Sequence, residues 1–143
     1  MTVREELYSI RASQAEINIL QERIEEARYS LYPHAIAYDG DKVQTSPSDR
    51  MSEVEAKIDE YIRMMQAKLR PLIERKIRAE RMIDKLEDSR QRQALSLYFL
   101  SSKRMSMEDV GKQMGYAQSR TYDFWRAGLE ELEEKIGRNR KES

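Results

Sequence analysis

The sequence contains no cysteine and a single histidine among its 143 residues. Without thiols or paired imidazoles it has no disulfide framework, no thiolate nucleophile and no ligand set for a structural zinc ion. We therefore expect no metal and no cofactor. We also expect no enzymatic activity, because no combination of nucleophile, base and orienting group can be assembled from this composition.

Glycine and proline are also scarce, with five and three copies. An all-β fold needs many more turn residues, so this scarcity favours an all-α fold. Charged residues make up 36% of the chain, which indicates long, solvated helices rather than one large core. No apolar run approaches the length that crosses a membrane, and the first residues lack a signal-peptide pattern. We expect a soluble, cytoplasmic protein that binds neither a membrane nor a small-molecule substrate.

The formal net charge is zero, yet the charges are unevenly distributed along the chain. Residues 1–32 carry four basic and six acidic side chains. Residues 89–126 carry seven basic and three acidic side chains, a net charge of +4. Only this second stretch offers a polyanion such as DNA a favourable surface.

A seven-residue repeat runs through residues 2–32. Its apolar positions are Val3, Ile10, Ile17, Ile24 and Leu31. A sustained repeat of this period predicts a helix that packs in a coiled-coil manner. We expect the helix to end at Tyr32, because the residue before a proline is disfavoured in helical geometry.

A second apolar stripe with three- and four-residue spacing predicts a helix over residues 51–88. Pro71 lies inside it and is expected to kink or break the helix near residues 68–70. The turn-rich residues 33–50 form a loop long enough for the two helices to lie antiparallel. A two-helix hairpin seldom buries enough apolar surface alone, so we expect residues 1–88 to oligomerise or to bind a partner.

Residues 89–136 have the spacing of a helix-turn-helix domain. Ser106 and Asp109 stand where a capping box starts a short helix. Gly115 supplies a turn, because glycine adopts the left-handed conformation at little cost. A second helix is expected over residues 117–136.

The second helix divides into two faces. The inward face is predicted from spacing to hold Thr121, Phe124, Trp125, Gly128, Leu129 and Leu132. Polar side chains that could reach base edges remain outward on its first half, and the predicted base contacts are Gln118, Ser119, Tyr122 and Arg126. The predicted phosphate contacts are Arg120, Lys112, Lys103 and Arg104. Residues 137–143 are polar, and we expect them to be a disordered tail.

Two parts of the chain resemble known families. Residues 88–90 and 95–98, followed by 106–122 and 128–132, resemble a sigma-70 region-4-like helix-turn-helix. Residues 41–51 look like the loop of a small phage and prophage family of Gram-positive hosts, in which a helical hairpin precedes that domain. The family is similar to the ArpU and RinA late-gene regulators of phages.

The resemblance implies DNA binding in the transcriptional control of late phage genes, without enzymatic activity. The sequence departs from the pattern at two positions. Ala117 stands where such recognition helices begin with Ser or Thr, and Asp123 adds a negative charge near the DNA-facing side. The expected architecture is all-α: a long antiparallel hairpin followed by a sigma-70 region-4-like domain.

We expect the partners to be double-stranded DNA and a second copy of the chain, with RNA polymerase as a further candidate. Two alternatives fit the same sequence. A phage DNA-packaging protein, resembling the small subunit of a terminase, would form a ring of many subunits. An adaptor that binds only proteins would bind RNA polymerase through the hairpin and would have no affinity for DNA.

Overall fold

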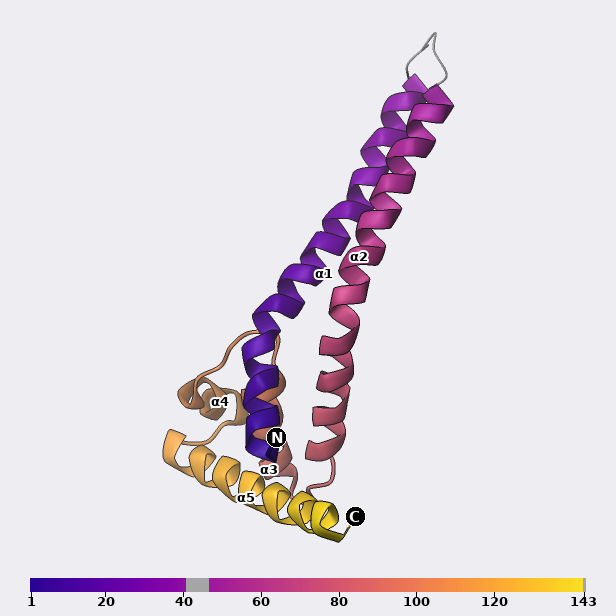
Figure 1. The fold of residues 1–143 in the computed structure, drawn as a ribbon. Coiled ribbons are helices and arrows are strands. Elements are labelled where there is room, and N and C mark those ends of the chain that lie inside the picture. Colours follow the sequence, from indigo (N-terminus) through magenta and orange to yellow (C-terminus); the bar gives the residue numbers. More distant parts are fainter. Residues whose placement is uncertain (41–46, 143) are drawn as a thin grey trace. The chain divides into compact units, whose positions relative to one another are not determined.

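The computed structural model describes the backbone of residues 1–40 and 47–142 and the side chains of residues 1–30 and 50–137. Helices account for nearly all of this described backbone and no strand occurs in it, which confirms an all-α protein (Figure 1). The helices are α1 (Val3–Gly40), α2 (Pro47–Ile83), α3 (Ser89–Leu100), α4 (Met107–Met114) and α5 (Gln118–Glu142). The predicted loop at 33–50, including the loop residues of the family resemblance, lies largely outside the described residues.

Neither internal proline ends a helix. α1 continues to Gly40, so the predicted end at Tyr32 is wrong, and α2 runs unbroken through Pro71. A proline inside a helix costs about 3 kcal/mol, because it removes one hydrogen bond and crowds the carbonyl four residues earlier. A helix of 37 or 38 residues keeps its many other backbone hydrogen bonds and its packed face, which offset that local cost. Pro47 begins α2, where its missing N–H would have no helical partner.

The chain divides into two compact units. The five-helix unit comprises residues 1–15 and 72–143, and the two-helix unit comprises residues 16–71. The first turns of α1 and the last turns of α2 therefore pack with α3, α4 and α5. The sequence placed a domain boundary at residue 88, and the compact units do not divide there.

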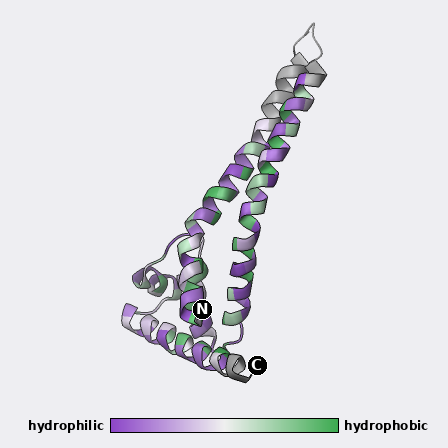
Figure 2. Ribbon diagram, viewed as in Figure 1, coloured by the Kyte–Doolittle hydropathy of each residue, from purple (hydrophilic) through white to green (hydrophobic). Residues whose placement is uncertain are grey.

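One hydrophobic core fills the five-helix unit. Apolar and polar residues are interspersed along its helices (Figure 2). α3 packs against α4 and α5, and α4 packs against α5. Leu7, Leu95, Leu129 and Leu132 are fully buried. Burial of each leucine contributes about 2 kcal/mol relative to exposure. The rest of the core comprises Val3, Ile10, Ala79, Ile83, Leu86, Ala94, Phe99, Leu100, Trp125 and Ile136.

Local signals fix the start and end of α4 as predicted. The Asp109 N–H donates to Ser106 Oγ at 3.1 Å, and the Ser106 N–H donates to Asp109 Oδ2 at 3.0 Å, which completes the capping box. Gly115 ends the helix with a φ of 81°, and its N–H donates to the Gly111 carbonyl at 2.9 Å. α5 continues to Glu142, so the tail predicted as disordered from residue 137 extends the helix instead.

In the two-helix unit α1 and α2 lie side by side and run in opposite directions (Figure 1). The buried apolar side chains of this unit are Ile17, Leu20, Ile24, Ile62 and Met65. All five belong to the predicted apolar stripes, and they fall at the helical spacing that puts them on one side of each helix. None of the described helices contains an apolar stretch long enough to span a membrane.

Candidate nucleic-acid interface

α4 and α5 approach closely at Gly111. A Cβ placed on this glycine would lie 2.9 Å from the Tyr116 carbonyl oxygen and 3.0 Å from Thr121 Oγ1. Thr121 is fully buried, and its hydroxyl donates to the Ala117 carbonyl at 2.9 Å. The absent side chain at Gly111 therefore lets the first turn of α5 pack against α4, which fixes the direction in which α5 leaves the turn.

The first half of α5 has two chemically distinct faces. Thr121, Trp125 and Leu129 are buried, as the spacing predicts, whereas Phe124 is only partly buried. The exposed face presents polar and charged groups: Gln118, Ser119, Arg120, Tyr122, Asp123 and Arg126. All four predicted base-contacting residues thus lie on the solvent side of one helix.

Tyr122 is held between two neighbours on this face. Its ring stacks on Trp125 with centroids 5.7 Å apart and an interplanar angle of 25°. The Arg126 guanidinium carbon lies 5.9 Å from the Tyr122 ring centroid. Trp125 is 7% exposed and Tyr122 is 44% exposed, so the tryptophan belongs to the core and the tyrosine to the surface, as predicted. The buried indole gives Tyr122 a fixed support.

Arg120 is placed differently from the other predicted phosphate contacts. Its guanidinium carbon lies 5.7 Å from the Tyr116 ring centroid and 5.6 Å from that of Phe124. Arg90, at the start of α3, lies 5.3 Å from the same Phe124 ring. Aromatic rings attract cations at such distances, so Phe124 gathers two exposed arginines from different helices. Arg90 belongs to the positive stretch 89–126 but is not among the predicted site residues.

The other three predicted phosphate contacts share one groove. Lys103, Arg104 and Lys112 line a groove of about 740 Å³ beside the α3–α4 connection, and all three are exposed. Lys112 pairs with Glu108 at 3.4 Å, an exposed contact of little energetic weight. Asp109 also lines the groove, but its carboxylate accepts the Ser106 N–H. That backbone hydrogen bond is the main cause of the lowered pKa of Asp109.

Arg92 contributes its charge to the fold rather than to a ligand surface. Its Nη1 atom donates to the Leu86 carbonyl at 2.5 Å and to the Glu87 carbonyl at 2.8 Å. These carbonyls follow the end of α2, where helical donors are missing and a cation is favoured. Arg92 therefore adds less to the external positive field than the sequence count suggests.

Arg11 of α1 fixes the connection between α3 and α4. Its Nε donates to the Tyr98 carbonyl at 3.1 Å, and its Nη2 donates to the Met105 carbonyl at 2.7 Å. The connection between these two carbonyls carries Lys103 and Arg104. Sequence reasoning missed Arg11 because its partners lie 87 and 94 residues away, and no local pattern predicts such pairs.

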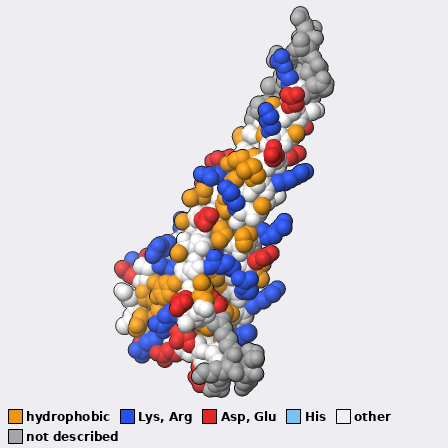
Figure 3. Space-filling view, viewed as in Figure 1, with side chains coloured by type: hydrophobic (Ala, Val, Ile, Leu, Met, Phe, Trp, Pro, Cys, Tyr) orange, Lys and Arg blue, Asp and Glu red, His pale blue; other side chains and the backbone are white. Residues whose placement is uncertain are grey.

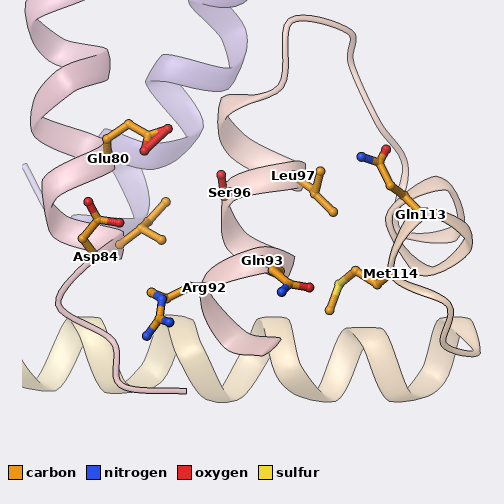
Figure 4. A pocket seen from close by; sticks show the side chains of 9 residues that line it. Glu80, Asp84, Arg92, Gln93, Ser96, Leu97, Gln113 and Met114 are labelled. Atoms are coloured by element: carbon orange, nitrogen blue, oxygen red, sulfur yellow. The ribbon is translucent and has the colours of Figure 1, made fainter. Parts of the chain in front are cut away.

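A separate pocket of about 400 Å³ lies between the end of α2, α3 and α4 (Figure 4). Glu80 projects from α2 and Asp84 directly follows its end, while Gln113 and Met114 line the α4 side. Ser96 of α3 also lines this pocket. Among the described residues, no group of three or more metal-ligating side chains is placed to hold an ion.

No protein-family model, curated protein or solved structure matches this chain.

Proposed function

We propose that this protein is a sequence-specific regulator of transcription that binds double-stranded DNA and places the first half of α5 in the major groove. The observation that supports the proposal most directly is the exposed face of Gln118, Ser119, Tyr122 and Arg126. Amide, hydroxyl and guanidinium groups are the side-chain donors and acceptors that read base edges. From Gln118 to Arg126 the helix rises about 12 Å, enough to follow about three or four base pairs.

The basic groove supports the same orientation. Lys103, Arg104 and Lys112 are exposed beside the α3–α4 connection. Such contacts to phosphates position a protein on DNA without reading its sequence. Beyond Arg126 the charges of α5 turn acidic with Glu130, and DNA contact is expected to end there. In this proposal α4 and α5 act as a helix-turn-helix, Arg120 keeps its role as a phosphate contact, and Arg90 is added to that set.

The biological setting of the proposal depends on the sequence resemblance alone. That resemblance favours control of late genes in a phage or prophage, with RNA polymerase as a candidate partner. A dimer would present two copies of α5 and read two half-sites, whose separation the dimer geometry would set.

Selection from a random duplex pool by the purified full-length protein, at two salt concentrations, tests the proposal. We expect enrichment of a defined site that persists at the higher salt. A pool that binds strongly at low salt without enrichment would contradict sequence-specific reading and favour the packaging alternative. No retention at low salt would overturn DNA binding altogether and favour the protein-only adaptor.

A further inference from the structure

We propose that one side of the two-helix unit is an interface with a second copy of this chain, and that the two copies form a four-helix bundle. The interface is the apolar face formed by Ile19 and Ala27 of α1 and Ile58, Tyr61 and Met64 of α2. Such a dimer would carry the two DNA-binding units of the proposed regulator. The interface is tested without DNA, so its test does not depend on DNA binding.

The packing between α1 and α2 leaves this face incompletely covered. Ile19 is 47% exposed, Tyr61 is 39% exposed and Met64 is 51% exposed. Ala27 and Ile58 are only partly buried and line a surface hollow of about 350 Å³ with Tyr61. Hydrophobic side chains reach the surface along this unit (Figure 3). A cluster of large apolar side chains on one side of a solvated hairpin is typical of a protein-binding surface.

Helical spacing places the exposed residues on the same side as the hollow. Arg23 lines the hollow from α1, and Ile19 precedes it by four residues, one helical turn. Tyr61 lines it from α2, and Met64 follows by three residues. The two helices run in opposite directions. The step toward the N-terminus from Arg23 to Ile19 and the step toward the C-terminus from Tyr61 to Met64 therefore lead to the same end of the unit. Ile19 and Met64 therefore lie at similar heights.

The charges of the two helices identify the second copy as the occupant. Over residues 16–30, α1 carries four acidic and two basic side chains, whereas over residues 57–71 α2 carries four basic and two acidic ones. Among the described side chains of this unit, no ion pair joins these two stretches. When a second copy of such a pair is rotated by 180° about an axis between the copies, its basic helix faces the acidic helix of the first copy, and its acidic helix faces the basic one.

A twofold axis parallel to the helices satisfies both requirements. Such an axis packs each α1 against the partner's α2. It also keeps each residue at the same position along the bundle axis in both copies. Glu26 and Lys57 line the same hollow, so each would face its counterpart across the interface. Ile19 would face the partner's Met64 in the same way. Both chain connections to the five-helix unit leave from one end of the two-helix unit, so both DNA-binding units would be attached at that end of the bundle.

The molar mass of the full-length protein in solution, measured by sedimentation equilibrium without DNA, tests the interface. We expect twice the chain mass of 17.0 kDa. Met64→Glu should weaken the dimer by about tenfold or more, because it places an unpaired carboxylate in an apolar contact. Ile77→Glu is the matched control, because Ile77 is a similarly exposed apolar residue of α2, at 44%, in the other unit. It should leave the mass unchanged.

Charge reversal tests the orientation of the two copies. Glu26→Lys and Lys57→Glu should each weaken the dimer at low salt, and the double variant should restore it. A monomeric wild-type protein, a ring of many copies, or a dimer that Ile77→Glu dissociates and Met64→Glu does not would overturn the proposed interface. Failure of the double variant to restore the dimer would overturn the twofold arrangement. Circular dichroism of each variant verifies that its helices are formed.

Discussion

The guanidinium carbon of Arg11 lies 4.0 Å from the ring centroid of Tyr98, and the same side chain donates to the Tyr98 carbonyl. The first turns of α1 are thereby bound to α3 and, through the Met105 carbonyl, to the connection that leads into α4. A residue near the start of the chain thus holds the segment that carries Lys103 and Arg104. The helix-turn-helix proposed for this protein includes the beginning of α1 as part of its structure.

Replacement of Arg11 by methionine should destabilise the five-helix unit by about 2 kcal/mol, since hydrogen bonds from a charged donor to two carbonyls are lost. Trp125 is the only tryptophan and lies in this unit, so its fluorescence during urea unfolding reports the change. Arg28→Ala, at an exposed position of the two-helix unit, is the control and should have little effect. Equal urea midpoints for Arg11→Met and the wild-type protein would contradict the anchoring role.

Alanine at Gly111 should destabilise the protein by about 1–3 kcal/mol, because its Cβ would press on backbone at Tyr116 and on Thr121. The same change at Gly137 meets nothing within 4 Å and should stabilise α5 by up to about 1 kcal/mol. Thermal unfolding of both variants measures the contrast. A tolerated alanine at Gly111 would show that α4 and α5 do not need their close approach there.

The capping carboxylate of α4 predicts a pH dependence of stability. Hydrogen bonding to the Ser106 backbone N–H lowers the pKa of Asp109 in the folded protein. The stabilisation is therefore fully present above the ordinary aspartate pKa, near 4, and is lost as the pH falls through the lower folded value. Asp109→Asn should lower stability at pH 7, and its difference from the wild-type protein should shrink at pH 3.

Urea unfolding at the two pH values measures this difference. Asp123→Asn is the control, because Asp123 is exposed on α5 and lies outside the capping box of α4. A deficit of Asp109→Asn that is the same at pH 7 and pH 3 would exclude ionisation of Asp109 as its cause.

Base-reading and phosphate-binding residues should respond differently to replacement. Arg126→Ala should relax the preference for particular bases by about 1–3 kcal/mol at the positions it reads. Lys112→Ala should weaken binding to all sequences alike and reduce the salt slope by about one unit. Arg90→Ala should behave like Lys112→Ala, because its guanidinium lies near the same Phe124 ring as that of Arg120, a predicted phosphate contact.

Fluorescence anisotropy with a selected site and a scrambled duplex, over a range of salt concentrations, separates these effects. Arg81→Ala, at an exposed position of α2, is the control for general loss of positive charge. If Arg126→Ala and Lys112→Ala both left affinity and specificity unchanged, the assigned contact face of α5 and its basic groove would be incorrect.

Much of the candidate interface was predictable from the sequence. The division of α5 into a core face with Trp125 and an exposed face with Tyr122 follows from helical spacing, because a helix repeats every 3.6 residues regardless of its surroundings. From the sequence, Lys103, Arg104 and Lys112 were predictable only as part of a local excess of positive charge. That they line one groove was not predictable. Arg90 was missed because its place at the Phe124 ring depends on how α3 packs against α5.

The sequence by itself determined the all-α class, the capping box at Ser106 and the left-handed turn at Gly115, since each depends on interactions within a few residues. The tertiary structure decided which arginines serve the fold: Arg11 and Arg92 bind backbone carbonyls, whereas Arg126 remains exposed. It also placed residues 1–15 with the last three helices rather than with the two-helix unit. The physical reason is the sequence separation over which each interaction acts. Caps and turns depend on neighbouring residues, whereas burial and long-range hydrogen bonds form only when distant segments pack together.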